Sequence, residues 1–255
     1  MGDIFAALGD RAENAVLIGG AVPGLIEERS LRNAPGHAGT TDVDILLDPV
    51  AFSIQEYETL AERLLERGYR YRLDRDGNEL KFSLEVDVDG HSVAVDFLAP
   101  PVPGKSGFRV PIQAGLHAHA LSGAHVPAWF SVDLTIEEEL VQGGYLPVRI
   151  RLVDVPGFVV LKALAFENRQ AYKDAYDLWY VLAHAKEGPM GIGGKLLPYA
   201  EDAEVARALE FLRVAFASAE SVGPVAVARF QETVGNEAER VAAQAYAVVQ
   251  SFLRG

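Results

Sequence analysis

Two aspartates separated by one residue form the first pattern in this chain that could do chemistry. Asp42 and Asp44 alternate with hydrophobic residues in the segment Thr41-Asp-Val-Asp-Ile-Leu-Leu47. Such alternation is typical of a β-strand and places both carboxylates on one face. Neighbouring carboxylates repel each other unless a cation lies between them. The pattern therefore predicts a divalent-metal site, with Mg²⁺ as the expected ion.

A third carboxylate is expected from a neighbouring strand. Asp96 lies in the apolar segment Val95-Asp-Phe-Leu98, where a carboxylate without a partner is costly to bury. Metals held by Asp42, Asp44 and Asp96 would suit phosphoryl or nucleotidyl transfer, in which two ions stabilise the attacking and leaving oxygens. Asp87 competes with Asp96 for the third position, and simple exposure at a strand edge is the alternative for the first two aspartates.

A Gly-Gly pair precedes these aspartates. Gly19 and Gly20 follow the apolar run Val16-Leu-Ile18 and lead into a short stretch of helical spacing. Glycines permit a tight turn and close approach of backbone to phosphate, and a helix N-terminus favours anions. We expect both glycines to bind a nucleotide, with Thr41 supplying the hydroxyl that Ala21 lacks. An ordinary strand-to-helix turn is the alternative.

The order Gly-Gly, then Thr-Asp-x-Asp, resembles the signature of the DNA polymerase beta type nucleotidyltransferase superfamily. The later segments Lys162-Ala-Leu-Ala165 and Lys173-Asp-Ala-Tyr-Asp177 are similar to motifs of the AbiEii toxin family within it, and the match runs in order through residues 15–185. The resemblance implies an α+β fold, in which a mixed sheet with helices is followed by a C-terminal helical domain. We expect a nucleotidyltransferase domain at residues 1–155 and the helical domain, completing the site, at residues 156–255.

The resemblance also implies roles for single residues. Asp42 and Asp44 would bind both metal ions, while Asp96 would bind metal and help to deprotonate the acceptor hydroxyl.

In the helical part, the resemblance makes Lys162 and Asp177 catalytic and assigns Lys173 and Asp174 to nucleotide binding. Lys162 would contact the triphosphate. The residues themselves also allow simpler interpretations. Lys162 could extend its aliphatic stem to solvent, and Lys173 with Asp177 could form an ordinary surface pair four residues apart on a helix.

The activity implied by the resemblance is transfer of NMP from an NTP to an acceptor. The implied acceptor is the 3′ end of tRNA, which would make the protein the toxin of a toxin–antitoxin pair, with an antitoxin as partner. The net charge of −13 disfavours general polyanion binding. A small molecule such as an aminoglycoside, or a protein side chain, is therefore an alternative acceptor. A nucleotide-binding module without turnover and a metal-dependent glycosyltransferase are further alternatives.

Composition excludes several other classes. The sequence has no cysteine, which excludes disulfides and thiol catalysis. No apolar run approaches the ~20 residues of a membrane helix and no targeting segment is evident, so we expect a cytoplasmic protein. His117, His119 and His125 lack a convincing zinc-ligand pattern. The stretch 140–173 is rich in cations and predicts either a local basic face or scattered solvated side chains.

The remaining patterns predict the elements that position these residues. Helices are expected at 4–15, 50–67, 155–168 after Asp154, and 171–185. Strands are expected at 69–73, 80–88, 91–98 and 148–153, with a hairpin at Asp89-Gly90. Residues 104–140 indicate only mixed loop and strand. A glycine-rich link is expected at 188–194, and a capping box of Asn236 with Glu239 at the start of the last helix.

Overall fold

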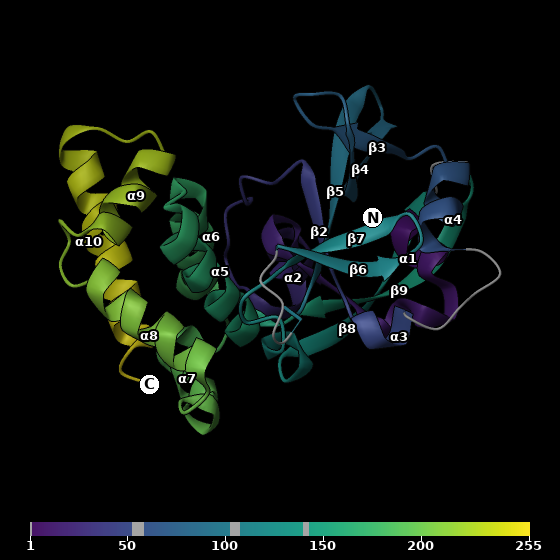
Figure 1. Cartoon of the computed structure of the whole chain (residues 1–255). Helices are drawn as coiled ribbons and strands as arrows, with labels where there is room; N and C mark the ends of the chain where they lie inside the picture. Colours follow the sequence, from purple (N-terminus) through teal and green to yellow (C-terminus); the bar gives the residue numbers. More distant parts are fainter. Residues whose placement is uncertain (1, 53–58, 103–107, 140–142) are drawn as a thin grey trace. The chain divides into compact units, whose positions relative to one another are not determined.

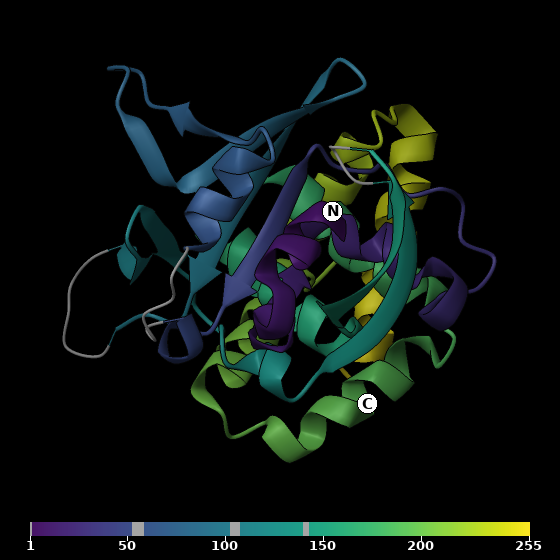
Figure 2. The ribbon, with the colours of Figure 1, turned by 90° about the vertical axis from the view of Figure 1, so that its right-hand side faces the viewer.

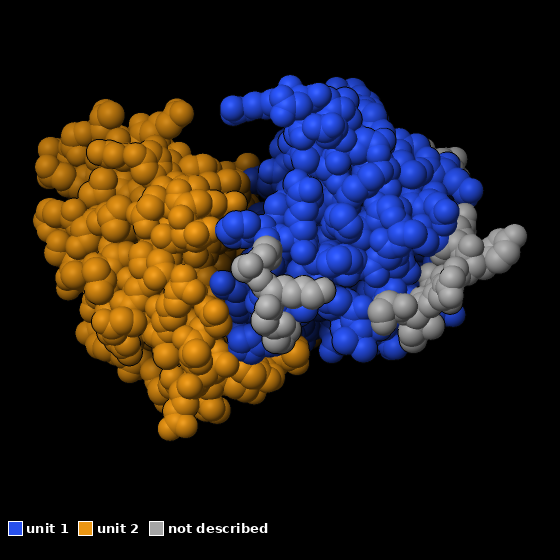
Figure 3. Space-filling model, in the orientation of Figure 1, with its two compact units in different colours: residues 1–22, 39–127, 131–153 blue, residues 23–38, 128–130, 154–255 orange. Residues whose placement is uncertain are grey.

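The computed structural model describes residues 2–52, 59–102, 108–139 and 143–255. The chain forms two compact units, coloured separately in Figure 3. Unit 1 comprises residues 1–22, 39–127 and 131–153, and unit 2 comprises residues 23–38, 128–130 and 154–255. The last change of unit falls beside the boundary at residue 155 that the sequence suggests. Two short earlier segments also belong to unit 2.

Unit 1 is built on a mixed β-sheet of nine strands within the described ranges (Figures 1 and 2). The strands are β1 (Ala15–Ile18), β2 (Asp42–Leu47), β3 (Arg70–Leu73), β4 (Glu79–Val88), β5 (His91–Ala99), β6 (Arg109–Gln113), β7 (Leu116–Ala120), β8 (Ser131–Glu139) and β9 (Tyr145–Val153). Their order is β3-β4-β5-β2-β1-β9-β8, and β7 joins β5 to β6. Strand β2 runs parallel to β5 and antiparallel to β1. The mixed sheet with helices confirms the expected α+β class.

The helices divide between the units. Unit 1 carries α1 (Gly2–Leu8), α3 (Pro49–Phe52), α4 (Leu60–Glu66) and the 3₁₀ turns η1 (Gly9–Asn14) and η2 (Gly19–Ala21), with η3 (Val126–Ala128) at its margin. Unit 2 carries most of α2 (Val22–Ser30), then α5 (Val155–Arg169), α6 (Tyr172–His184), α7 (Gly188–Leu196), η4 (Leu197–Tyr199), α8 (Ala203–Ala215), α9 (Val222–Phe230) and α10 (Gly235–Phe252). This succession is the expected C-terminal helical region.

Burial of apolar side chains fixes the central strands. Leu17, Ile45, Val95 and Phe97 are completely buried. Full burial of side chains of this size contributes roughly 1.5–3 kcal/mol each. Since a shift of one residue would turn these side chains to the opposite face, their burial fixes the register that aligns the polar positions between them.

Several sequence predictions are confirmed at the element level. Strands β3, β4, β5 and β9 and helices α5 and α6 lie where expected, within a few residues. Asp89 and Gly90 both have positive φ, 52° and 78°, as a type I′ hairpin requires. Asp154 caps α5 by accepting a hydrogen bond from the Val155 amide. Residues 108–139 of the unassigned stretch form β6, β7, η3 and β8.

Two predictions for the N-terminal helices were wrong. The helix expected at 4–15 ends at Leu8, and a 3₁₀ helix continues from Gly9, whose φ is +57°. The single helix expected at 50–67 is interrupted, because Thr59 is extended and forms a capping box with Glu62 at the start of α4. Residues 53–58, also part of that prediction, lie outside the described ranges.

Two predictions for the C-terminal region were also wrong. The glycine-rich link is helix α7, where a Cβ on Gly193 would lie 2.1 Å from the carbonyl oxygen of Phe252. Close packing against α10 therefore outweighs the low helix propensity of glycine. Helix α10 follows Val234 without a side-chain capping bond, so the predicted capping box of Asn236 and Glu239 is not formed.

Candidate functional site

Three strands of unit 1 present a polar row on one face of the sheet. Asp44 on β2 is in register with Asp96 on the parallel strand β5, and Asp96 is in register with Ser83 on the antiparallel strand β4. Residues in register point to the same face of a sheet. Asp42, two positions before Asp44 on the same strand, shares this face. The sheet therefore brings the three predicted carboxylates together on one surface.

Asp96 has polar partners on the strands beyond it. Ser83 Oγ donates a hydrogen bond to Asp96 Oδ1 at 2.5 Å, and Arg72 Nη1 lies 3.9 Å from the same oxygen. Arg72 also donates to Ser83 Oγ at 3.3 Å. Asp96 therefore has the polar partners that we expect for a carboxylate in an apolar strand.

Gly19 lies against the carboxylate of Asp44. Its φ is +76°, and a Cβ built on it would lie 1.9 Å from Asp44 Oδ2. Only glycine fits this close approach in this backbone conformation. Gly20 is buried in the same 3₁₀ turn. The approach of this backbone to a phosphate, expected from the sequence, stays a prediction. The close approach to Asp44 is an additional reason why a glycine is required at position 19.

The threonines before β2 set the start of that strand. Thr40 Oγ1 accepts a hydrogen bond from the Asp42 amide at 3.2 Å, and the Thr41 carbonyl accepts one from the Ala94 amide at 3.1 Å. Thr41 and Asp42 are exposed. The backbone at the edge of the polar row is thus held while both side chains face solvent.

Unit 2 contains a second charged cluster, which is buried. Lys162 Nζ on α5 lies 3.0 Å from Asp174 Oδ1 and 2.7 Å from Asp177 Oδ2, both on α6. Both carboxylates are completely buried, and Lys162 is 7% exposed. The interpretation in which Lys162 extends to solvent was therefore wrong. A charge at this position in an apolar helix is compensated by two buried anions, as burial of charge requires.

Further cations complete this cluster. Arg169 binds Asp174 in a bidentate manner at 2.6 and 2.7 Å. Lys173 Nζ lies 2.9 and 3.0 Å from the two oxygens of Asp177. The Lys173 and Asp177 pair is therefore not an ordinary surface pair, because its carboxylate is buried.

The cluster shifts the proton affinities of its members. Burial alone would raise the pKa of Asp177, but the hydrogen bond with His37 and the charges of Lys162 and Lys173 hold it at about 2. Burial is likewise outweighed at Asp174, where Arg169 and Lys162 lower the pKa. The two carboxylates raise the pKa of Lys162 against its own burial. All three groups are therefore charged at neutral pH.

His37 joins the cluster from a segment far away in sequence. Its Nε2 lies 3.0 Å from Asp177 Oδ1, and its side chain is 3% exposed. The ring contacts Tyr176 and Tyr180, and Tyr180 Oη donates a hydrogen bond to the Pro35 carbonyl. Sequence reasoning missed His37 because this loop has no periodicity. Its one signal is a histidine shortly before the Thr-Asp-x-Asp segment.

The predicted site residues thus form one set in each unit. Gly19, Gly20, Thr41 and the three aspartates belong to unit 1, whereas Lys162, Lys173, Asp174 and Asp177 belong to unit 2. Among the residues described, no three histidine or carboxylate side chains are grouped closely enough to hold a metal ion by themselves. Mg²⁺ is commonly bound by one or two carboxylates plus substrate phosphates and water. The register pair of Asp44 and Asp96 therefore fits Mg²⁺ in its donor chemistry.

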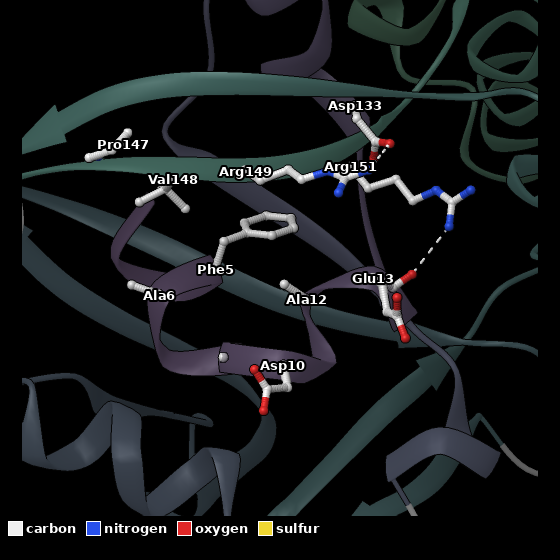
Figure 4. Close-up of a pocket in the computed structure, with 11 residues that line it drawn as sticks. Phe5, Ala6, Asp10, Ala12, Glu13, Asp133, Pro147, Val148, Arg149 and Arg151 are labelled. Atoms are coloured by element: carbon white, nitrogen blue, oxygen red, sulfur yellow. Dashed lines mark hydrogen bonds and ion pairs between the residues drawn. The ribbon is translucent and has the colours of Figure 1, made fainter.

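A pocket of about 480 Å³ lies between α1, η1 and strands β8 and β9 (Figure 4). Its lining includes Phe5, Arg149 and Arg151. Arg149 Nη2 lies 2.6 Å from Asp133 Oδ2, and Arg151 donates to the Glu13 carbonyl. None of the predicted site residues lines it. The cations of stretch 140–173 thus have polar partners here and in the buried cluster.

Comparison with known proteins leaves the family of this chain open. No protein family model matches the sequence. A stretch of 40 residues, 16% of the chain, is 45% identical to imidazolonepropionase from Pyrobaculum arsenaticum. The chain covers only 10% of the length of that protein. So short a stretch does not show the family of this chain. No helix in the described ranges is both long and apolar enough to cross a membrane.

Proposed function

We propose that this protein is a Mg²⁺-dependent nucleotidyltransferase that transfers NMP from an NTP to an acceptor and releases pyrophosphate. The observation that carries the proposal is the register of Asp44 with Asp96 on parallel strands, with Asp42 on the same face. Sequence resemblance to the AbiEii toxins supports the same chemistry. The proposed site of action is the cytoplasm.

The carboxylates define the metal-binding part of the proposal. Asp42, Asp44 and Asp96 would hold Mg²⁺ together with phosphate oxygens of the nucleotide. When bound, the metal would stabilise the negative charge that develops on the transferred phosphate and on the leaving pyrophosphate. The backbone of Gly19 supports this arrangement, because it abuts the Asp44 carboxylate and limits where that side chain can lie.

The chain's own groups would handle the proton and the substrate charge. Asp96 would accept the proton of the acceptor hydroxyl, and the Gly19-Gly20 backbone would approach a phosphate. In unit 2, three cations, Lys162, Arg169 and Lys173, lie against two buried carboxylates. Lys173, whose side chain is 33% exposed and whose ammonium group is held by Asp177, is the cation of this cluster that we propose for nucleotide binding.

The proposed acceptor is the 3′ end of tRNA, with the protein acting as a toxin that a cognate antitoxin neutralises. The net charge of −13 favours a second candidate, in which the acceptor is a small molecule or a protein side chain. Growth of cells that express the protein separates the two. A toxin arrests growth, and Asp44→Ala relieves the arrest. Drug resistance without arrest supports the small acceptor, and arrest that persists in Asp44→Ala would overturn the catalytic proposal.

A further inference from the structure

Ser83 is a buried hydroxyl group in strand β4. It is 1% exposed and lies in register with Asp96. It accepts a hydrogen bond from Arg72 Nη1 and donates one to Asp96 Oδ1. Arginine can only donate, and a hydroxyl has a single hydrogen to give. The contact with Arg72 therefore directs the Ser83 hydrogen toward Asp96 and gives the chain of hydrogen bonds one direction.

Both contacts within the described residues fall on one oxygen of Asp96. Ser83 and Arg72 approach Oδ1, so Oδ2 is the oxygen left for another ligand. A hydrogen bond to a charged carboxylate is short and roughly twice as strong as a neutral one. The Ser83 contact therefore limits rotation of the carboxylate.

A neighbouring pair on the same two strands serves as a comparison. Arg70 on β3 lies 3.0 Å from Glu85 on β4, and its side chain is 59% exposed. This pair resembles Arg72 and Ser83 in position along the strands but makes no contact with Asp96. An exposed ion pair of this kind contributes little to stability. The hydrogen bond from Ser83 to Asp96, with Arg72 bonded to Ser83 and 3.9 Å from the same Asp96 oxygen, distinguishes these contacts from ordinary pairing across β3 and β4.

We infer that Ser83 and Arg72 are positioning residues, which hold Asp96 Oδ1 so that Oδ2 faces the cation and the acceptor hydroxyl. This inference rests on the proposed function. Groups that orient metal-binding carboxylates typically contribute 10–100-fold to metal affinity or activity. The size of that contribution makes the inference measurable without knowledge of the acceptor.

The test is Mn²⁺ binding, measured from the electron paramagnetic resonance signal of free Mn²⁺. The proteins compared are the wild type, Ser83→Ala, Ser83→Thr, Arg72→Ala, Arg70→Ala and Asp44→Ala. A urea unfolding curve of each protein establishes that it folds. We expect Ser83→Ala to weaken Mn²⁺ binding about 10-fold, and Ser83→Thr, which keeps the hydroxyl, to restore it. Removal of a positive charge by itself strengthens cation binding. If Arg72→Ala binds Mn²⁺ more weakly than the wild type and Arg70→Ala does not, the loss is therefore explained by lost positioning of the Asp96 carboxylate.

Two results would overturn the inference in distinguishable ways. If the wild type binds Mn²⁺ more tightly than Asp44→Ala does, but Ser83→Ala and Arg72→Ala bind as tightly as the wild type, the positioning role is wrong and the proposed function stands. If the wild type binds no more tightly than Asp44→Ala, the metal site fails and the positioning role fails with it. Arg72 lies on an edge strand with 43% of its side chain exposed, so Arg72→Ala should fold even if Ser83→Ala does not.

Discussion

At the scale of the residue, the carboxylates of this protein are defined by the groups that touch them. Asp44 abuts Gly19, Asp96 is held by Ser83, and Asp177 lies among cations in a buried cluster. Ser83 holds a single oxygen of Asp96, whereas both oxygens of Asp177 lie in ion pairs with lysines. The two kinds of aspartate should therefore respond differently to substitution.

Replacement of Gly19 by alanine tests the contact with Asp44. The added Cβ must displace the Asp44 carboxylate, and φ of +76° adds roughly 1 kcal/mol of strain. We expect Gly19→Ala to lose nucleotidyl transfer and Asp44-dependent Mn²⁺ binding. Gly90→Ala is the matched control, since its φ is +78° and a Cβ there meets no atom within 4 Å. Equal loss of binding in both variants would show that backbone strain alone is responsible.

Replacement of Asp177 by asparagine tests the buried cluster. Removal of one partner of a buried pair should cost about 3–5 kcal/mol near pH 7, because Lys162 and Lys173 lose an anion. The folded-state pKa of about 2 lies below the ordinary value of 3.8, so this stabilisation is present above about pH 4 and is lost as the pH falls toward 2. The difference in the free energy of unfolding between the wild type and Asp177→Asn should therefore shrink by about 2 kcal/mol over this interval.

Urea unfolding of wild type and Asp177→Asn near pH 7 and pH 2.5 measures this effect. Asp133→Asn is the control, because Asp133 pairs with Arg149 at an exposed position and should contribute at most about 1 kcal/mol. If the difference in the free energy of unfolding between Asp177→Asn and the wild type is the same at both pH values, the lowered pKa of Asp177 is contradicted.

Sequence patterns could predict part of the site for physical reasons. Alternation placed Asp42 and Asp44 on one face, and the cost of burying Asp96 indicated that it needs a partner. Ser83, Arg72 and His37 could not be predicted, because strand register and long loops bring them to their partners. Those pairings depend on burial of the whole sheet or helix rather than on local spacing.

At the scale of the element, local signals succeed where a side chain and the backbone form one unit. The Asp89-Gly90 hairpin and the Asp154 cap could be predicted from the sequence, because each depends on residues next to one another. Helix α7 could not be predicted from the sequence, because the packing of Gly193 against Phe252 favours a helix despite its glycines. Tertiary contacts of that kind override propensity.

The capping box at the start of α4 gives a prediction at this scale. Thr59 accepts from the Glu62 amide, and Glu62 accepts from the Thr59 amide. Thr59→Ala should lower the free energy of unfolding by about 1 kcal/mol, while Thr59→Ser should retain most of the stability. Chemical denaturation measures both variants. Equal losses would show that the methyl group of Thr59, rather than its hydroxyl, stabilises the helix.

At the scale of the whole molecule, the charge limits how an acceptor can be recognised. The net charge is −13, and the described cations of stretch 140–173 have polar partners. The net charge therefore disfavours the neutralisation of many phosphates along a polyanion. An RNA acceptor would have to be held at its end rather than along its length.

Binding to a random DNA duplex at several salt concentrations tests this limit. We expect weak binding whose logarithm falls with the logarithm of salt concentration with a slope smaller in magnitude than about 3, since few counterions are released. Fluorescence anisotropy of a labelled duplex provides the measurement, with a basic DNA-binding protein as positive control. Tight binding with a steep slope would reveal a basic surface that the described residues do not show.

Label transfer is the direct test of the proposed nucleotidyltransferase activity. The purified protein is incubated with Mg²⁺ and each α-³²P-labelled NTP in turn, with and without total tRNA, beside Asp44→Ala and the control Asp133→Asn. We predict that the wild type and Asp133→Asn transfer label to an acceptor and release pyrophosphate, whereas Asp44→Ala does neither. Equal labelling by folded Asp44→Ala, or no label and no pyrophosphate from the wild type with tRNA, small-molecule and protein acceptors, would contradict the assignment.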